Sequence, residues 1–126
     1  MNNEEWRKYV IKEKKKYKKI GYVICPAFFD EKIYFNKHGF NHLIRKMGKP
    51  RPVNEQIRRI KLIPHALDIL RSSDKVKVEK TNVINGYTAE FWSFSKKIGQ
   101  KCIKVIVRQL KNGNKHFFSI MDKNVG

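Results

Sequence analysis

The chain has 126 residues, with 29 Lys and Arg against 11 Asp and Glu and a formal net charge of +18 at pH 7. This length predicts one domain with a core of its own. No apolar run is long enough for a membrane span or a secretion signal, so we expect a cytoplasmic protein. The charge excess predicts a polyanionic partner, nucleic acid first, although a membrane surface or solubility alone would also use it.

The two cysteines, Cys25 and Cys102, lie far apart and form no C-x-x-C spacing. Such isolated thiols argue against a zinc knuckle, a redox motif or a disulfide framework. We predict that both are small core residues.

The segment from Glu4 to Ile20 is predicted to be a helix capped by Asn2 or Asn3, with acids in its first turn and lysines toward its end. Its apolar stripe is thin, so we interpret residues 1–20 as a basic helical arm and 21–126 as a single domain. The lysine-rich end of this arm is either a contact to the body or to nucleic acid, or an ordinary solvated helix face. Both interpretations stay open.

The next elements are predicted from short apolar runs and helical spacing. Tyr22–Cys25 and Lys32–Phe35 are short strands or extended loop. Apolar residues recur at helical spacing from Asn36 to Met47, which predicts a helix with one buried face. A further helix runs from Pro52 through Leu62, and His65–Leu70 forms a turn or two in a new direction.

From Val76 onward the pattern changes from helical to alternating. Four strands are predicted, at Val76–Val78, Tyr87–Phe94, Lys101–Leu110 and His116–Met121. Connections this short force neighbouring strands to run antiparallel. The predicted fold class is α+β, with N-terminal helices packed on one face of a four-stranded antiparallel meander.

Asn112-Gly113 is typical of a two-residue hairpin turn, which fixes the register of the last two strands. That register places Val105 opposite Ile120, Ile106 opposite Ser119, Val107 opposite Phe118, Arg108 opposite Phe117 and Gln109 opposite His116. One face is then apolar and helix-covered, with Ile103, Val105, Val107, Phe118 and Ile120. The other face carries Lys104, Ile106, Arg108, Phe117 and Ser119.

This second face suits a phosphodiester and a stacked base, although an ordinary solvated sheet face is equally consistent with it. His116 joins Arg108 only if a bulge at Asn114 or Lys115 lengthens the loop. Otherwise His116 caps the sheet edge.

His42 lies off the apolar stripe of its helix, beside Arg45 and Lys46. Their charges lower the pKa of the imidazole and keep it neutral, as a general base must be, although a solvated histidine on a basic face is an equally consistent interpretation. The acids show no spacing typical of a metal-dependent nuclease, and phosphate-binding loops are absent from the sequence. A site of His, Arg, Lys and Ser suits RNA, which brings its own 2′-hydroxyl nucleophile.

The candidate site residues follow from these patterns. The predicted catalytic residues are His42, Arg108, His116 and Ser119, without a metal or other cofactor. The predicted RNA-binding residues are Arg45, Lys46, Arg51, Arg59, Lys104 and Phe117.

Three stretches resemble the barnase, EndoU, colicin and RelE-like nuclease superfamily, and more narrowly its phage-associated and small-genome bacterial members. They are the helical Gly-Phe-Asn-His-Leu-Ile-Arg-Lys from Gly39, Arg-Pro-x-x-Glu-Gln-Ile-Arg-Arg from Arg51, and Val-Ile-Val-Arg108 with His116-Phe-Phe-Ser-Ile. The resemblance covers residues 22 to 122. It implies N-terminal helices on a four-stranded antiparallel sheet and a metal-independent ribonuclease, with the site roles falling on the four predicted catalytic residues.

The expected function is therefore an endoribonuclease that leaves a 2′,3′-cyclic phosphate, acting as a toxin or a phage-derived effector. Its expected partners are RNA, in a ribosome or a tRNA, and an acidic antitoxin or immunity protein, with no membrane contact. Two alternatives stay open: a non-catalytic RNA- or ribosome-binding module, and a protein-interaction module for an acidic partner.

Overall fold

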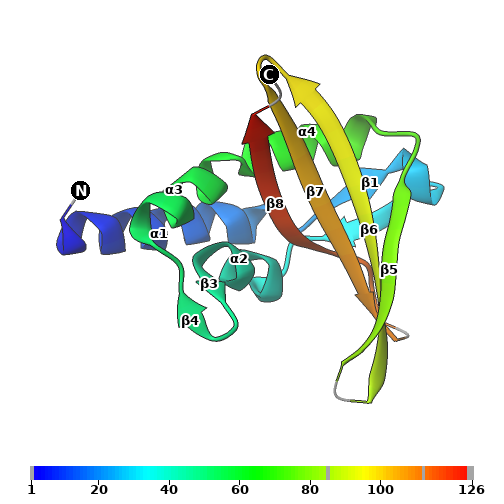
Figure 1. Ribbon diagram of the computed structural model, residues 1–126, viewed down its shortest axis with the longest axis horizontal. Coiled ribbons are helices and arrows are strands. Elements are labelled where there is room, and N and C mark those ends of the chain that lie inside the picture. The colour runs from blue at the N-terminus through cyan, green and yellow to red at the C-terminus, as the bar shows by residue number, and fades with distance from the viewer. Residues whose placement is uncertain (1, 85, 112, 125–126) are drawn as a thin grey trace.

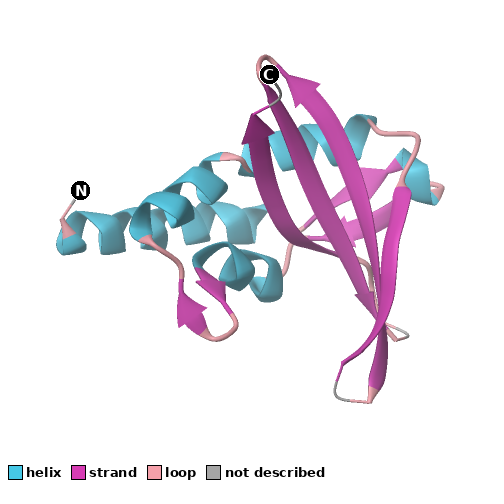
Figure 2. Cartoon of the chain, viewed as in Figure 1, coloured by secondary structure: helices cyan, strands magenta, loops and turns pink. Residues whose placement is uncertain are grey.

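The computed structural model describes residues 2–84, 86–111 and 113–124. The fold is α+β, with helices and a mainly antiparallel sheet (Figures 1 and 2). The helices are α1 (Asn3–Ile20), the short 3-10 helix η1 (Pro26–Phe28), α2 (Lys37–Ile44), α3 (Val53–Lys61) and α4 (Ile63–Ser72). The strands are β1 (Tyr22–Cys25), β2 (Glu31–Tyr34), β3 (Arg45–Lys46), β4 (Lys49–Pro50), β5 (Lys77–Ile84), β6 (Tyr87–Ile98), β7 (Lys101–Leu110) and β8 (His116–Asn124).

The main sheet differs from the predicted four-stranded meander. Its strand order is β1-β2-β8-β7-β6-β5, so the meander of β5 to β8 is extended by two more strands. The sheet is mixed because β2 runs parallel to β8, with Tyr34 opposite His116. Local patterns could not predict this pairing, since it joins a short strand near the start of the chain to the last strand.

The helix boundaries follow from their caps. The Asn2 side chain accepts a hydrogen bond of 2.8 Å from the Glu5 backbone N–H at the start of α1, and the Asn36 side chain accepts one of 3.1 Å from the His38 backbone N–H at the start of α2. Pro64 lies in the first turn of α4, where its missing N–H costs no hydrogen bond. This helix therefore continues to Ser72, beyond the turn or two predicted.

The core lies between the helices and one face of the sheet. α4 packs against β1, β6 and β7, and α2 against β8 (Figure 1). α1 is anchored at its C-terminal end by Tyr17, which is 2% exposed and donates a hydrogen bond of 2.7 Å to the Asn36 carbonyl. Cys25 is buried in this core, whereas Cys102 is only half-buried.

The pairing of β7 with β8 contains a register shift that decides which side chains face the site. Val105 pairs with Ile120 and Ile106 with Ser119, as the two-residue turn predicts. Between Ile106 and Val107 the register moves by one residue, so that Val107 pairs with Phe117 and Arg108 with His116. Phe118 is the extra residue of this β-bulge.

Because of the bulge, the predicted partners of Val107, Arg108 and Gln109 are wrong. The predicted faces of Phe117 and Phe118 are exchanged for the same reason. Phe117 is 0% exposed, so it belongs to the core and is not available to stack a base, while Phe118 faces the site instead. The gain is aromatic packing: the Phe117 ring stacks on Phe35 with centroids 4.9 Å apart. The bulge lies at Phe118, not at Asn114 or Lys115 as the longer-loop alternative requires. Asn112 of the predicted Asn112-Gly113 turn lies outside the described residues.

Candidate functional site

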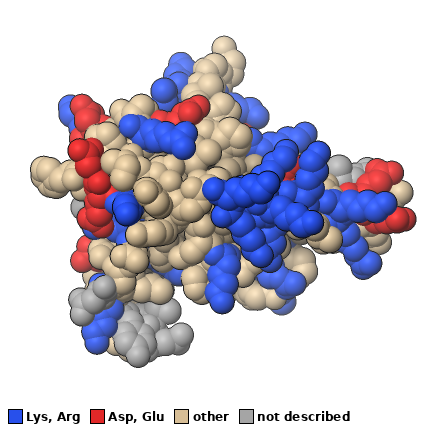
Figure 3. Space-filling view, turned by 180° about the vertical axis from the view of Figure 1, so that it is seen from behind, with Lys and Arg blue, Asp and Glu red and all other residues tan. Residues whose placement is uncertain are grey.

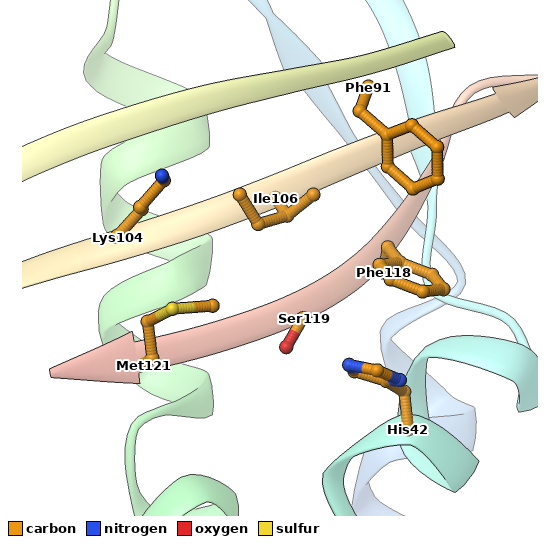
Figure 4. Close-up of a pocket in the computed structure, with 7 residues that line it drawn as sticks. All are labelled: His42, Phe91, Lys104, Ile106, Phe118, Ser119 and Met121. Carbon is orange, nitrogen blue, oxygen red and sulfur yellow. The ribbon is translucent and has the colours of Figure 1, made fainter. Parts of the chain in front are cut away.

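An open cavity of about 300 Å³ lies where α2 meets the sheet (Figure 4). This volume is at the lower end of the range for small-molecule sites and would hold a small part of a ligand such as one nucleobase. Its wall combines aromatic, aliphatic and polar side chains from α2, β6, β7 and β8. The residues are His42, Phe91, Lys104, Ile106, Phe118, Ser119 and Met121.

His42 enters the cavity from the last turn of α2. Its ring stacks on Phe118, with centroids 4.3 Å apart and an angle of 27° between the planes. Burial, and then the charges of Arg51, Arg59, Arg108 and Lys46, lower the pKa of His42 to about 4. The direction agrees with the sequence prediction, but burial is the largest cause. The imidazole is therefore neutral at pH 7.

Arg51 contacts His42 from the protein interior and is itself buried, with 7% of its surface exposed. Its Nε donates to the backbone oxygen of His42 at 3.0 Å, and its Nη2 lies 3.4 Å from His42 Nε2. Because a guanidinium only donates, this contact favours the tautomer with a free electron pair on Nε2. The structure thus corrects the prediction that Arg51 contacts RNA phosphate, since it lies beneath the site rather than on the surface.

Arg59 holds Ser119 in place by hydrogen bonds to its hydroxyl and to the neighbouring backbone. Its Nη1 donates to Ser119 Oγ at 3.3 Å and to the Ile120 carbonyl at 3.0 Å. One oxygen of Glu55 accepts from both arginines, at 3.1 Å from Arg51 Nη1 and 3.2 Å from Arg59 Nε. A single carboxylate therefore fixes the two arginines that hold His42 and Ser119, and Arg59 is half-buried rather than freely exposed to RNA.

Arg108 lies next to the cavity, on the far side of Phe118. Its guanidinium carbon is 4.5 Å from the centre of the Phe118 ring, and its Nε donates to His116 Nε2 at 3.0 Å. His116 is 4% exposed. Burial, and then the charge of Arg108, lower the pKa of His116 to about 4, although a backbone hydrogen bond at Asn114 acts in the opposite direction.

The four predicted catalytic residues do not converge in one cavity. His42 and Ser119 share the first cavity, whereas His116 lines a neighbouring one of about 390 Å³ beside Tyr34 and His38. Arg108 and Phe118 stand between them. The result is a row of side chains, ordered His42, Phe118, Arg108 and His116, rather than a single pocket.

The remaining predicted RNA-binding residues lie at two places. Arg45 and Lys46 are exposed on the β3–β4 hairpin that follows α2, and Lys104 is half-buried in the cavity wall.

Three residues of the cavity wall are not among the predicted site residues: Phe91, Phe118 and Met121. The short Gly99-Gln100 turn sets β6 against β7 so that Phe91 pairs with Arg108, and this signal could have placed Phe91. Phe118 could not be placed without the bulge.

Two further observations concern the part of the chain that the structure describes. There, no three His, Cys, Asp or Glu side chains are grouped so that they could hold a metal ion. In the same residues no helix is both long and apolar enough to cross a bilayer.

Comparison of the chain with protein-family models, with curated proteins and with solved structures finds no match.

Proposed function

We propose that this protein is a metal-independent endoribonuclease that cleaves RNA by attack of a 2′-hydroxyl on the adjacent phosphate. The observation that supports this most is the neutral imidazole of His42, which lines a cavity together with Lys104 and Ser119. A neutral base beside fixed cations and a hydroxyl fits a reaction in which RNA supplies the nucleophile.

In the proposed reaction the 2′-hydroxyl replaces Arg51 Nη2, which lies 3.4 Å from His42 Nε2, and Nε2 then takes the hydroxyl proton. The 2′-oxygen forms a bond to phosphorus, and the bond from phosphorus to the 5′-oxygen breaks. Lys104 and Arg108 stabilise the negative charge on the phosphoryl oxygens, and a water molecule from solvent protonates the departing 5′-oxygen. The products are a 2′,3′-cyclic phosphate and a 5′-hydroxyl.

His116 does not act as the proton donor in this reaction. Its Nε2 already accepts the Arg108 Nε–H at 3.0 Å, and its lowered pKa leaves it neutral at pH 7. We assign it as a positioning residue for Arg108. The Phe118 ring lies between His42 and Arg108, so it orients these two side chains rather than a base.

The test is cleavage of a fluorescent RNA in EDTA with analysis of the product ends. We expect His42→Ala to reduce the cleavage rate by about 10²- to 10⁴-fold. His65→Ala is the matched control, because His65 lies on α4 outside the cavity and its loss should leave the rate unchanged. A substrate with a single 2′-deoxy position should resist cleavage there while still binding. Clean wild-type protein that leaves every RNA intact would contradict the proposal, and unchanged rates in His42→Ala and Arg108→Ala would contradict the site.

A non-catalytic RNA-binding module is the second candidate. It is favoured by the low pKa of both histidines, because neither imidazole is then protonated at pH 7 to serve as the acid. Salt dependence does not separate the two, since phosphate contacts dominate affinity in both. Intact RNA recovered from a tight complex would favour the binding module.

A further inference from the structure

Helix α1 has two faces with opposite chemistry. One carries Tyr17, whose ring packs against the core rings of Phe40 and Phe117 with centroids 5.2 and 6.3 Å apart. The other carries five lysines and one isoleucine that line a shallow hollow along the helix: Lys8, Ile11, Lys12, Lys15, Lys16 and Lys19. We call the five lysines the α1 lysine face. Their spacing of three and four residues places them on one side of the helix.

Viewed from behind, the molecule shows a dense cluster of Lys and Arg side chains in the region of α1 (Figure 3). Lys8 pairs with Glu4 at 3.3 Å and Lys16 with Glu13 at 3.2 Å. Within the described part of the chain, Lys12, Lys15 and Lys19 have no carboxylate within ion-pair distance. Like charges three and four residues apart destabilise a helix, so this arrangement favours a role with an anionic partner.

The α1 lysine face is on the other side of the sheet from the cavity. Phe117 and Phe118 are neighbours in β8, and the bulge directs Phe117 toward Tyr17 and Phe118 into the cavity. α1 therefore packs on the core side, and its lysines point away from its buried face. A ligand in the cavity and a ligand on the α1 lysine face occupy separate surfaces.

We infer that the α1 lysine face is a second RNA-binding surface, which holds phosphates of the same RNA outside the cavity. This inference rests on RNA being the ligand of the proposed function. An anionic membrane is a poorer fit, because membrane-surface helices need a broad apolar face. Here the lysines are accompanied by Ile11, which is 57% exposed, while Tyr17 is turned into the body.

Separate surfaces make the contribution of α1 depend on RNA length. A chain of 126 residues has a radius of gyration of about 14 Å, so a path from one side to the other is on the order of 50 Å. With one phosphate per about 3.4 Å of a stacked strand, on the order of fifteen nucleotides are needed to reach both surfaces. The affinity of a five-nucleotide RNA bound in the cavity should not depend on the α1 lysine face, whereas the affinity of a thirty-nucleotide RNA should.

The experiment measures binding of 2′-O-methyl RNA of five and thirty nucleotides by fluorescence anisotropy across a salt series, so that cleavage cannot interfere. The test variant is Lys12→Gln, Lys15→Gln and Lys19→Gln together. The matched control is Arg7→Gln, Lys14→Gln and Lys18→Gln, which removes the same charge from the same helix outside the α1 lysine face. Circular dichroism and thermal unfolding verify that both variants fold.

For the thirty-nucleotide RNA, we expect the test variant to lower the slope of log affinity against log salt by about 2, at about 0.7 per lost phosphate contact on a single strand. The control should change it by less than 1, and the five-nucleotide RNA should bind both variants like wild type. An equal fall of the slope in the two variants would overturn the inference. So would a test variant that binds RNA like wild type but loses binding to phosphatidylserine vesicles, measured in parallel. A length-dependent loss in a protein that never cleaves RNA would uphold it while contradicting the proposed catalysis.

Discussion

At Gly39 the helix that carries His42 packs closely against strand β8. A Cβ added there would overlap the backbone oxygen of Phe117 and lie 2.6 Å from the Tyr17 hydroxyl and 2.8 Å from Cδ2 of the Phe117 ring. Helix propensity alone favours Ala over Gly by about 1 kcal/mol. Overpacking costs about 1–3 kcal/mol, and a backbone oxygen in a paired strand cannot rotate away, so the upper part of that range applies.

We therefore expect Gly39→Ala to lower the free energy of unfolding by about 2 kcal/mol. With an unfolding entropy of about 2.1 cal/mol/K per residue over 126 residues, this equals a fall in Tm of about 8 °C. Asn41→Ala is the matched control, because Asn41 is an exposed residue of the same helix and its replacement should leave the Tm unchanged or slightly higher. Differential scanning calorimetry measures both.

A Tm of Gly39→Ala at or above that of wild type would refute the close packing of α2 on β8. A second measurement connects this packing to the site. Lifting α2 away from β8 should separate the His42 ring from Phe118, so the NMR signals of the His42 imidazole should move toward their positions in an unstructured peptide.

Two further predictions concern the charges around the site. The pKa values of His42 and His116 lie at about 4 in the folded state, against an ordinary value of 6.5. Between these two values the unfolded chain binds more protons than the folded protein, so the free energy of unfolding should fall as the pH drops from about 6.5 toward about 4. Urea unfolding between about pH 7.5 and pH 5 should show this fall in wild type and less of it in His42→Gln with His116→Gln, and imidazole titrations by NMR near pH 6.5 would contradict it. Glu55→Gln should destabilise the fold by about 1 kcal/mol, because it removes the carboxylate shared by Arg51 and Arg59. The control Glu4→Gln removes only an exposed pair with Lys8 and should cost less than about 0.5 kcal/mol; equal effects of the two substitutions would argue against the network.

Local chemistry in the sequence was sufficient for much of the fold. The alternation of Lys101–Leu110 predicted β7 with the bounds that the structure has, and the acids, the lysines and the Asn cap predicted α1 to within a residue. The predicted register also holds for the pairs Val105–Ile120 and Ile106–Ser119, which lie on the far side of the bulge from the turn. These features depend on neighbours a few residues apart, whose periodicity and capping act without the rest of the chain.

The arrangement of the site depended instead on contacts between distant segments. The sequence placed His42 and Ser119 among the candidates, but the choice between Phe117 and Phe118 as the residue facing the cavity required the bulge. That bulge is supported by packing of Phe117 against Phe35 and Tyr17, which come from the first third of the chain.

The burial of Arg51 likewise came from tertiary structure, because its partners His42 and Glu55 are brought around it by two helices. The sequence by itself determined which residue types, charges and local elements this protein has. Only tertiary structure decided which of those charges are buried supports and which face a ligand, because burial and register are set by side chains far apart in the sequence.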